Sequence, residues 1–139
     1  MAEQDNVQTV KEAYAAFGRG DIPAILNLLS EDVEWHIPGP SAIIPFAGEF
    51  RGREGVGRFF AALGGAEDVE IFEPREFVAQ GDKVVVMGRY RGRIKATGQV
   101  DDIEFVHVFN VRDGRITNYR QYNDTAPTVA AYSASAATA

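Results

Sequence analysis

The stretch IEFVHVFNVRDGRITNYRQYND, residues 103–124, decides the fold that we expect for this chain. Two apolar runs flank Asp113-Gly114, and an Asp-Gly pair between alternating apolar residues is the strongest short-range signal of a β-hairpin. His107 lies in the middle of the first run, where an ionisable ring is costly unless the protein satisfies or uses it. We therefore look for the functional site on this hairpin.

Loop lengths predict which side chains share a face of the sheet. A two-residue loop at 113–114 places His107 opposite Arg120, and a similar loop at 98–99 places Tyr90 opposite His107. The face that we expect to be covered by helices then carries these side chains: Tyr90, Ile94, Phe105, His107, Phe109, Arg120 and Tyr122. The outer face carries alternating charges: Arg89, Arg91, Arg93 and Lys95 against Asp102 and Glu104.

Apolar periodicity predicts the other elements. Helices are expected over residues 7–17, after an N-cap at Asp21, and over 56–63 with an end at Gly64-Gly65. Strands are expected over 33–37, 69–79, 84–97, 100–111 and 116–124, with Pro74 marking a bulge or an edge, and residues 41–52 form a loop or flap. Three helices followed by a four-stranded antiparallel meander make an α+β domain with its helices on one face.

Composition limits the class of protein. The 139 residues suffice for one domain, which we place at 1–132 with a flexible tail at 133–139. A net charge of −6 argues against nucleic-acid or membrane partners, and the lack of cysteine excludes disulfides. No signal peptide or membrane span is recognisable, so we expect a cytoplasmic protein. The two histidines lack a metal-binding spacing, and neither a metal nor a cofactor is expected.

The outer sheet face predicts an oligomer. Besides its charges, it receives a group of apolar side chains that nothing else in the chain is left to cover: Val85, Met87, Val106, Val108 and Tyr119. A homodimer packed through this face is the expected arrangement.

Each candidate site residue also has a structural interpretation. Tyr14 can be a core residue with a satisfied hydroxyl, and His107 can be a buried neutral ring bonded to Tyr90 or Arg120. Arg120 can neutralise a nearby carboxylate, and Asp124 can cap a short helix that begins near Thr125. Trp35 forms a wall of the pocket in either case.

The chain resembles the SnoaL-like, ketosteroid-isomerase-like branch of the nuclear transport factor 2-like (NTF2-like) superfamily. The resemblance covers nearly the whole chain and rests on residues 14–17, 20–21, 28–35, 46–56, 107–116 and 122–124. It implies a cystatin-like curved antiparallel sheet around a conical pocket, often in a dimer. In the ketosteroid isomerases, Tyr14 has a counterpart, but the two catalytic aspartates fall at Ile37 and His107 here, which argues against that route. SnoaL-like polyketide cyclases use a last-strand aspartate with a nearby histidine, an arrangement that Asp124 and His107 resemble.

We therefore expect a cofactor-independent acid–base enzyme, cyclase- or isomerase-like, that acts on an apolar carbonyl compound. Asp124 would remove a proton α to the carbonyl, and His107, helped by Tyr14 or Tyr90, would donate to the enolate oxygen. The remaining expected ligand contacts are Trp35, Phe60, Phe105, Arg120 and Tyr122. A non-catalytic ligand-binding or interaction module is the alternative, and epoxide opening by water is a third possibility.

Overall fold

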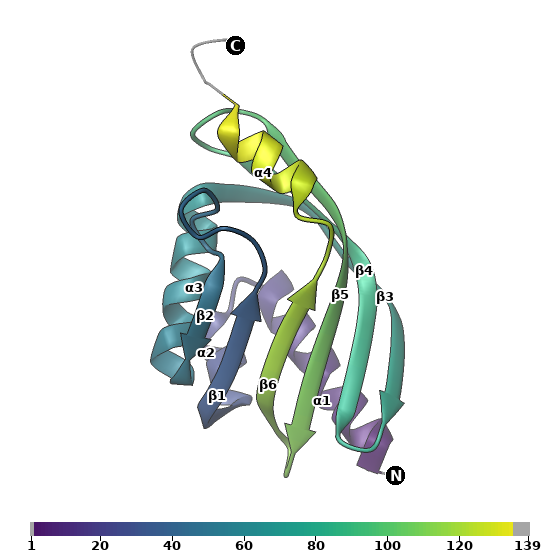
Figure 1. Ribbon diagram of the computed structural model, residues 1–139. Coiled ribbons are helices and arrows are strands. Elements are labelled where there is room, and N and C mark those ends of the chain that lie inside the picture. Colours follow the sequence, from purple (N-terminus) through teal and green to yellow (C-terminus); the bar gives the residue numbers. More distant parts are fainter. Residues whose placement is uncertain (1, 135–139) are drawn as a thin grey trace.

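The computed structural model describes residues 2–134 and contains four helices and six strands (Figure 1). In chain order these are α1 (Ala2–Gly18), α2 (Ile22–Asn27), β1 (Leu29–Ile37), β2 (Gly48–Arg51), α3 (Gly52–Ala66), β3 (Glu67–Gln80), β4 (Lys83–Ile94), β5 (Val100–Arg112), β6 (Arg115–Tyr122) and α4 (Ala126–Ser133). Residues 135–139 of the expected tail lie outside the described residues. No helix within residues 2–134 is long and apolar enough to cross a membrane.

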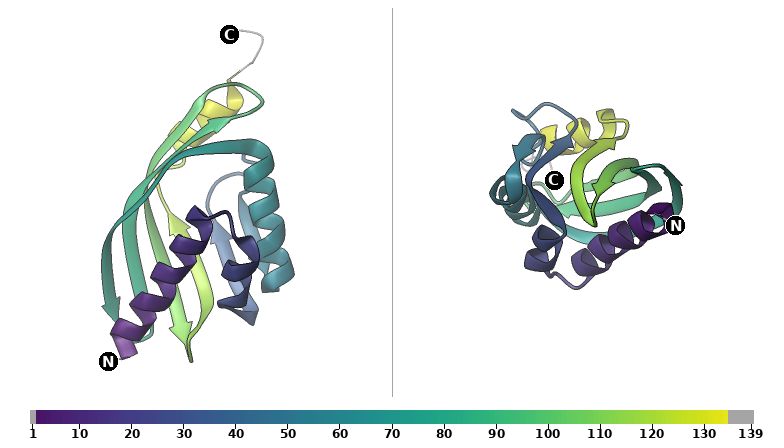
Figure 2. Two further views of the ribbon diagram at one scale, coloured as in Figure 1. Left: turned by 180° about the vertical axis from the view of Figure 1, so that it is seen from behind. Right: turned by 90° about the horizontal axis from the view of Figure 1, so that it is seen from below.

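The α+β fold class is confirmed, and the sheet is larger than the sequence predicted. Its order is β2-β1-β6-β5-β4-β3, so the meander β3–β6 is extended by β1, which pairs parallel to β6, and by β2. The sheet is strongly curved, with α1 and α3 on its concave side and α4 across the far end of β4 and β5 (Figure 2). β2 lies within the segment expected to be a flap, and Ile44 and Phe46 of that segment are buried, so the segment is part of the core.

Local signals explain several boundaries. The Asp21 carboxylate accepts a hydrogen bond from the Ala24 amide and caps α2, as predicted. The ladder between β3 and β4 is irregular after Pro74, on a strand that is indeed at the sheet edge. The expected end of α3 at Gly64-Gly65 is wrong, because the helix continues to Ala66. Packing of the buried Leu63 in the same turn outweighs the low helix propensity of the two glycines.

The predicted hairpin exists, but its register changes by one residue. Val111 pairs with Ile116 as expected, whereas His107 pairs with Gln121 instead of Arg120. The shift is a β-bulge: Thr117 of β6 is an extra residue opposite the step from Asn110 to Val111 in β5. One extra residue in a strand exchanges the two faces beyond it. Consequently the side chains on the concave side of β6 are those of Tyr119 and Gln121. Those of Arg120 and Tyr122 are on the outer side, with the guanidinium 5.9 Å from the Tyr122 ring centre.

The turn between β4 and β5 is longer than the two residues expected. Ile94 and Gln99 close it by a backbone hydrogen bond of 2.8 Å, and Arg93 pairs with Val100. The pairing is therefore displaced by four residues from the expected one, and Tyr90 lies opposite Ile103 rather than His107. Because four is even, every side chain of β4 stays on its predicted face. On the outer face, the pairing that results lets Arg89 bind Asp102 through two hydrogen bonds.

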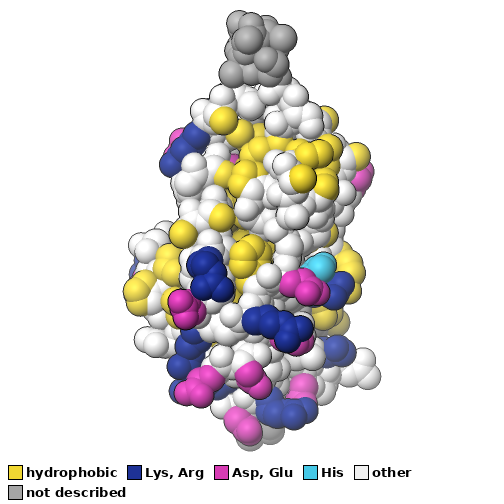
Figure 3. Space-filling view, turned by 60° about the vertical axis from the view of Figure 1, so that its left-hand side comes forward, with side chains coloured by type: hydrophobic (Ala, Val, Ile, Leu, Met, Phe, Trp, Pro, Cys, Tyr) yellow, Lys and Arg dark blue, Asp and Glu magenta, His cyan; other side chains and the backbone are white. Residues whose placement is uncertain are grey.

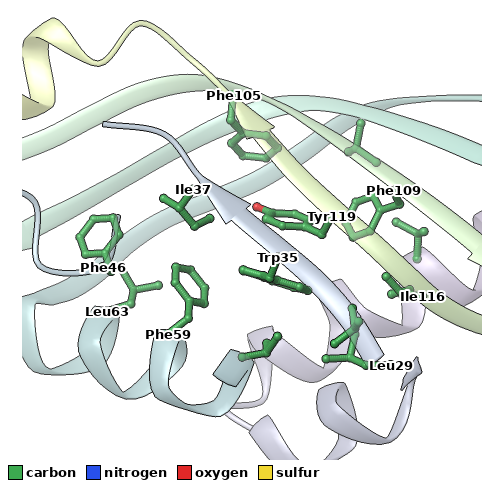
Figure 4. Close-up of a cluster of buried hydrophobic side chains, with 14 of the residues drawn as sticks. Leu29, Trp35, Ile37, Phe46, Phe59, Leu63, Phe105, Phe109, Ile116 and Tyr119 are labelled. Atoms are coloured by element: carbon green, nitrogen blue, oxygen red, sulfur yellow. The ribbon is translucent and has the colours of Figure 1, made fainter. Parts of the chain in front are cut away.

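The core fills the space between the concave sheet face and the helices. Figure 4 shows side chains from β1, α3, β5 and β6 meeting there, among them Trp35, Phe59, Phe105 and Tyr119. The Trp35 and Tyr119 rings stack with centroids 3.9 Å apart, a contact that depends on the bulge in β6. On the outside, acidic and basic side chains are interspersed over the lower half of the face in Figure 3, and hydrophobic side chains gather above them.

Candidate functional site

A cavity of about 90 Å³ lies between the concave sheet face and helices α1 and α3. Its lining is mostly aromatic, which is typical of small-molecule sites. Six of the residues predicted from the sequence line it: Tyr14, Trp35, Phe60, Tyr90, Phe105 and His107. An apolar cavity of roughly 150 Å³ holds benzene, so even a ligand of one ring requires side chains here to move.

One end of the cavity is built from α1 and β5. Tyr14 comes from α1, and its hydroxyl oxygen lies 2.7 Å from Nδ1 of His107. Burial lowers the pKa of His107 to about 3, against a smaller opposing effect of a hydrogen bond with Gln121, so the ring is neutral at neutral pH. Gln121 also accepts from the Tyr119 hydroxyl at 3.2 Å, which turns its amide oxygen toward this cluster. The pattern favours a proton on Nε2 of His107 and a Tyr14 hydroxyl that donates to Nδ1.

This arrangement limits what His107 can do. Nδ1 is already bonded to Tyr14, and a ring with so low a pKa is a weak proton acceptor near neutral pH. Burial raises the pKa of Tyr14 well above its usual value, so its hydroxyl keeps its proton. This end of the cavity is therefore suited to hydrogen bonding and poorly suited to proton transfer.

The other end of the cavity carries a buried pair of carboxyl groups, Asp101 at the start of β5 and Glu67 at the start of β3. Each residue is only 2% exposed, and Asp101 lines the cavity. Tyr90 donates to Glu67 Oε1 at 2.7 Å, and Tyr132 of α4 donates to Oε2. Thr128, also from α4, donates to Asp101 Oδ1 at 2.7 Å. Buried charged groups normally require such partners, and these three are hydroxyls.

The Glu67 carboxyl group is partly protonated near neutral pH. Burial raises the pKa of Glu67 to about 7, and the hydrogen bond and charge of Asp101 act in the same direction. The Tyr132 and Tyr90 hydroxyls oppose this shift, because they stabilise the anion. A carboxyl group with a pKa close to the working pH is suited to both accepting and donating a proton.

Gly92 makes the carboxyl end of the cavity possible. It pairs with Asp101 across the β4–β5 ladder. A Cβ atom at this position would lie 2.2 Å from Glu67 Oε1 and 2.5 Å from the Tyr90 hydroxyl. Any other residue would therefore separate the tyrosine from the carboxylate.

The two polar ends lie along one strand. Asp101 and His107 both point toward the cavity from β5 and are six residues apart, which is roughly 20 Å on a straight strand. Ile103 and Phe105 lie between them on the same face. A ring-sized ligand therefore contacts one polar end at a time.

A third polar atom is available in the cavity wall. The Trp35 indole Nε1 is buried and has no hydrogen-bond partner among the described residues. A buried N–H without an acceptor costs about 1–3 kcal/mol, and a ligand oxygen would remove that cost.

Three predicted site residues lie elsewhere. Asp124 is exposed and does not line the cavity, and its carboxylate accepts from the Ala126 amide at 3.1 Å, next to the start of α4. The N-cap of α4 is Thr125, so Asp124 lies one residue before the cap, near the alternative role that the sequence left open. Arg120 and Tyr122 are outside because of the bulge in β6, and Tyr122 is 51% exposed.

The carboxyl pair was not predicted. Asp101 has the same parity in β5 as Phe105 and His107, so continuing that inward pattern by two residues from Ile103 identifies it. Glu67 carries no comparable signal, because it follows α3 directly and its partners lie 23 and 65 residues away in the chain.

Comparison with known proteins agrees with this fold. The chain matches the SnoaL-like domain over residues 10–119. An uncharacterized protein of Mycobacterium tuberculosis strain H37Rv is 31% identical over 129 residues, covering 92% of this chain and 96% of that one.

Two solved structures are also similar. An NTF2-like protein from Burkholderia xenovorans LB400 is 38% identical with a TM-score of 0.86, over 95% of this chain and 98% of the other. TerC, co-crystallized with polyporic acid, is 30% identical with a TM-score of 0.80, over 94% and 99% of the two chains. With a curved sheet around an aromatic cavity and a domain match over most of its length, this chain belongs to the SnoaL-like family of the NTF2-like superfamily.

Proposed function

We propose that this protein is a cofactor-independent general acid–base enzyme, isomerase- or cyclase-like, that acts on an apolar carbonyl compound in the aromatic cavity. The observation that carries this proposal is the buried Asp101–Glu67 pair: Asp101 opens onto an otherwise apolar cavity, and burial raises the pKa of Glu67 to about 7. Polar groups with shifted pKa values in an apolar cavity are typical of catalytic sites. The organic acid co-crystallized with the related TerC supports a small organic ligand here.

Asp101 is the proposed catalytic residue, since it is the carboxyl group that lines the cavity. It accepts a proton from the carbon α to the carbonyl, which gives the enolate. Return of that proton from Asp101 to a different carbon completes an isomerisation. Attack of the enolate on a second carbonyl, whose oxygen takes up the proton from Asp101, completes a ring closure. Glu67 does not line the cavity, and its two oxygens are held by the Tyr90 and Tyr132 hydroxyls.

Tyr14 and His107 serve the opposite end of the cavity in this proposal. Their role is binding, because Nδ1 of His107 is already bonded to Tyr14 and the ring has a low pKa. The Trp35 indole is a donor in the cavity wall that is left for a ligand oxygen.

The test compares Asp101→Asn with Asp124→Asn, a matched control outside the cavity. Each protein is incubated in D2O with a β,γ-unsaturated ketone, an aldol-competent polyketide ester and a hydrophobic epoxide, and products are identified by mass spectrometry. We expect solvent deuterium or a mass-neutral product from the wild type and Asp124→Asn, and none from Asp101→Asn. Equal turnover in Asp101→Asn would refute the proposed role of the pair.

A non-catalytic binding protein is the second candidate, favoured by the cavity's apolar lining and small volume. The same experiment separates the two. Binding of all three probes without any conversion would support the binding module, and a product heavier by one water would support epoxide hydrolysis.

The proposal includes a homodimer that packs through the outer sheet face. Apolar side chains form a stripe across four strands there: Val78, Val85, Met87, Val106, Val108 and Tyr122. Val108 lies opposite Arg120, so Val108→Glu introduces a charge that the monomer can pair and a buried dimer interface cannot. We expect sedimentation velocity to show a dimer for the wild type and a monomer for Val108→Glu. A monomeric wild type at micromolar concentration would exclude this assembly.

A further inference from the structure

Helix α4 reaches the carboxyl end of the cavity with two side chains. It is a short helix, Ala126–Ser133, that crosses the end of β4 and β5 (Figure 1). Thr128 is 4% exposed and donates to Asp101, and Tyr132 donates to Glu67. An eight-residue helix is marginal on its own, so its position depends on contacts of this kind.

The hydroxyl donors are distributed unequally between the two carboxyl groups. Both oxygens of Glu67 accept from tyrosines, one from β4 and one from α4, while Asp101 Oδ1 accepts from Thr128. Only one oxygen of the pair, Asp101 Oδ2, is left without a hydroxyl donor among the described residues. The donors therefore leave Asp101 Oδ2 as the oxygen that is free to accept a proton or to bind a ligand.

We propose that α4 is a functional part of this site, and that Thr128 and Tyr132 are positioning residues which hold Asp101 and Glu67 in the orientation that presents Asp101 to the cavity. The proposal deepens the proposed function, on which it rests for its catalytic meaning. The positioning itself can be measured without a substrate.

Tyr132 is held in place by its hydroxyl, which bonds to Glu67, and by its ring, which packs against Phe46. Its ring packs edge-on against Phe46 with centroids 6.0 Å apart, and Phe46 itself lines the cavity. The groups that act on Glu67 come from three elements, namely Asp101 from β5, Tyr90 from β4 and Tyr132 from α4. Removing a donor to the anion and removing the neighbouring carboxylate must therefore shift the Glu67 titration in opposite directions.

The experiment follows the Glu67 side-chain carboxyl carbon by NMR during a pH titration, in protein labelled at glutamate side chains. Tyr132→Phe removes one hydroxyl and should raise the pKa of Glu67 above about 7, by about one, as expected for loss of a charge-assisted hydrogen bond. Asp101→Asn should lower it toward its usual range. Tyr122→Phe is the matched control, because this tyrosine is exposed on the outer face, and it should leave the titration unchanged.

Thr128→Val gives a second variant in case Tyr132→Phe fails to fold. It removes the donor to Asp101 with little change in shape. It should also move the Glu67 titration, because the hydrogen bond and charge of Asp101 act on Glu67. Unshifted titrations in both α4 variants would overturn the proposal, and so would shifts of equal sign and size in Tyr122→Phe. Opposite shifts for Tyr132→Phe and Asp101→Asn without any turnover would leave α4 as the positioning element and refute only the proposed enzyme activity.

Discussion

The shifted pKa of Glu67 predicts an unusual pH dependence of stability, which Glu67→Gln isolates. In the unfolded chain the carboxyl titrates near its usual value of 4.5, and in the folded protein near 7. Between these values the folded state binds more protons than the unfolded state, so the free energy of unfolding falls as the pH rises. Each pKa step of one corresponds to about 1.4 kcal/mol, which gives a loss on the order of 3 kcal/mol across this window.

The assay is urea denaturation of the wild type and Glu67→Gln over a pH series that spans both pKa values. The stability difference between the two proteins should be most favourable to the wild type below pH 4.5, decline between pH 4.5 and about 7, and level off above that. Because both proteins keep His107, the subtraction removes its contribution. Glu70→Gln is the control of opposite sign, since the hydrogen bonds from Arg91 and Arg93 lower the pKa of Glu70. A wild-type advantage that stays constant or grows with pH would refute the reasoning.

Three further predictions test other parts of the cavity. His107→Gln should remove part of the acid sensitivity: the folded ring stays neutral down to about pH 3, so the wild type loses stability as the pH falls below 6.5, on the order of 5 kcal/mol, measurable by urea denaturation. Gly92→Ala should destabilise by about 1–3 kcal/mol because its Cβ meets Glu67, whereas Gly64→Ala, with open space around it in α3, should stabilise by about 0.5–1 kcal/mol. Phe60→Ala should cost about 2–4 kcal/mol and increase uptake of a hydrophobic fluorescent dye, because Phe60 lies between the cavity and a surface groove.

Periodicity was sufficient to predict most of the elements, β2 excepted, and six of the residues that line the cavity. The inward positions of β4 and β5 follow from simple alternation, so Tyr90, Phe105 and His107 were placed on the correct face even though the β4–β5 pairing was displaced. The even displacement preserved the faces, and apolar spacing in the first helix placed Tyr14 on the side that meets His107.

The predictions that were wrong depended on a local irregularity and on long-range contacts, neither of which a periodic pattern encodes. The residues around Thr117 carry no sequence signal for the bulge. Its effect is that Tyr119 and Gln121, in place of the expected Arg120 and Tyr122, face the cavity. Pairing of β1 with β6 and the contacts of α4 with Glu67 join segments far apart in the chain, and a helix–strand pattern does not encode such contacts.

The bulge in β6 has a consequence for how this family can diversify. Deleting Thr117 would make the ladder regular and still leave Tyr119 opposite Phe109 and Gln121 opposite His107, so the cavity wall would be kept. Losing the bulge while keeping all residues would instead turn the strand over beyond Thr117, so that Arg120 and Tyr122 enter the cavity while Tyr119 and Gln121 leave it. Aligned relatives with identical residues here can therefore present a neutral or a cationic wall to a ligand, depending on whether β6 has its bulge.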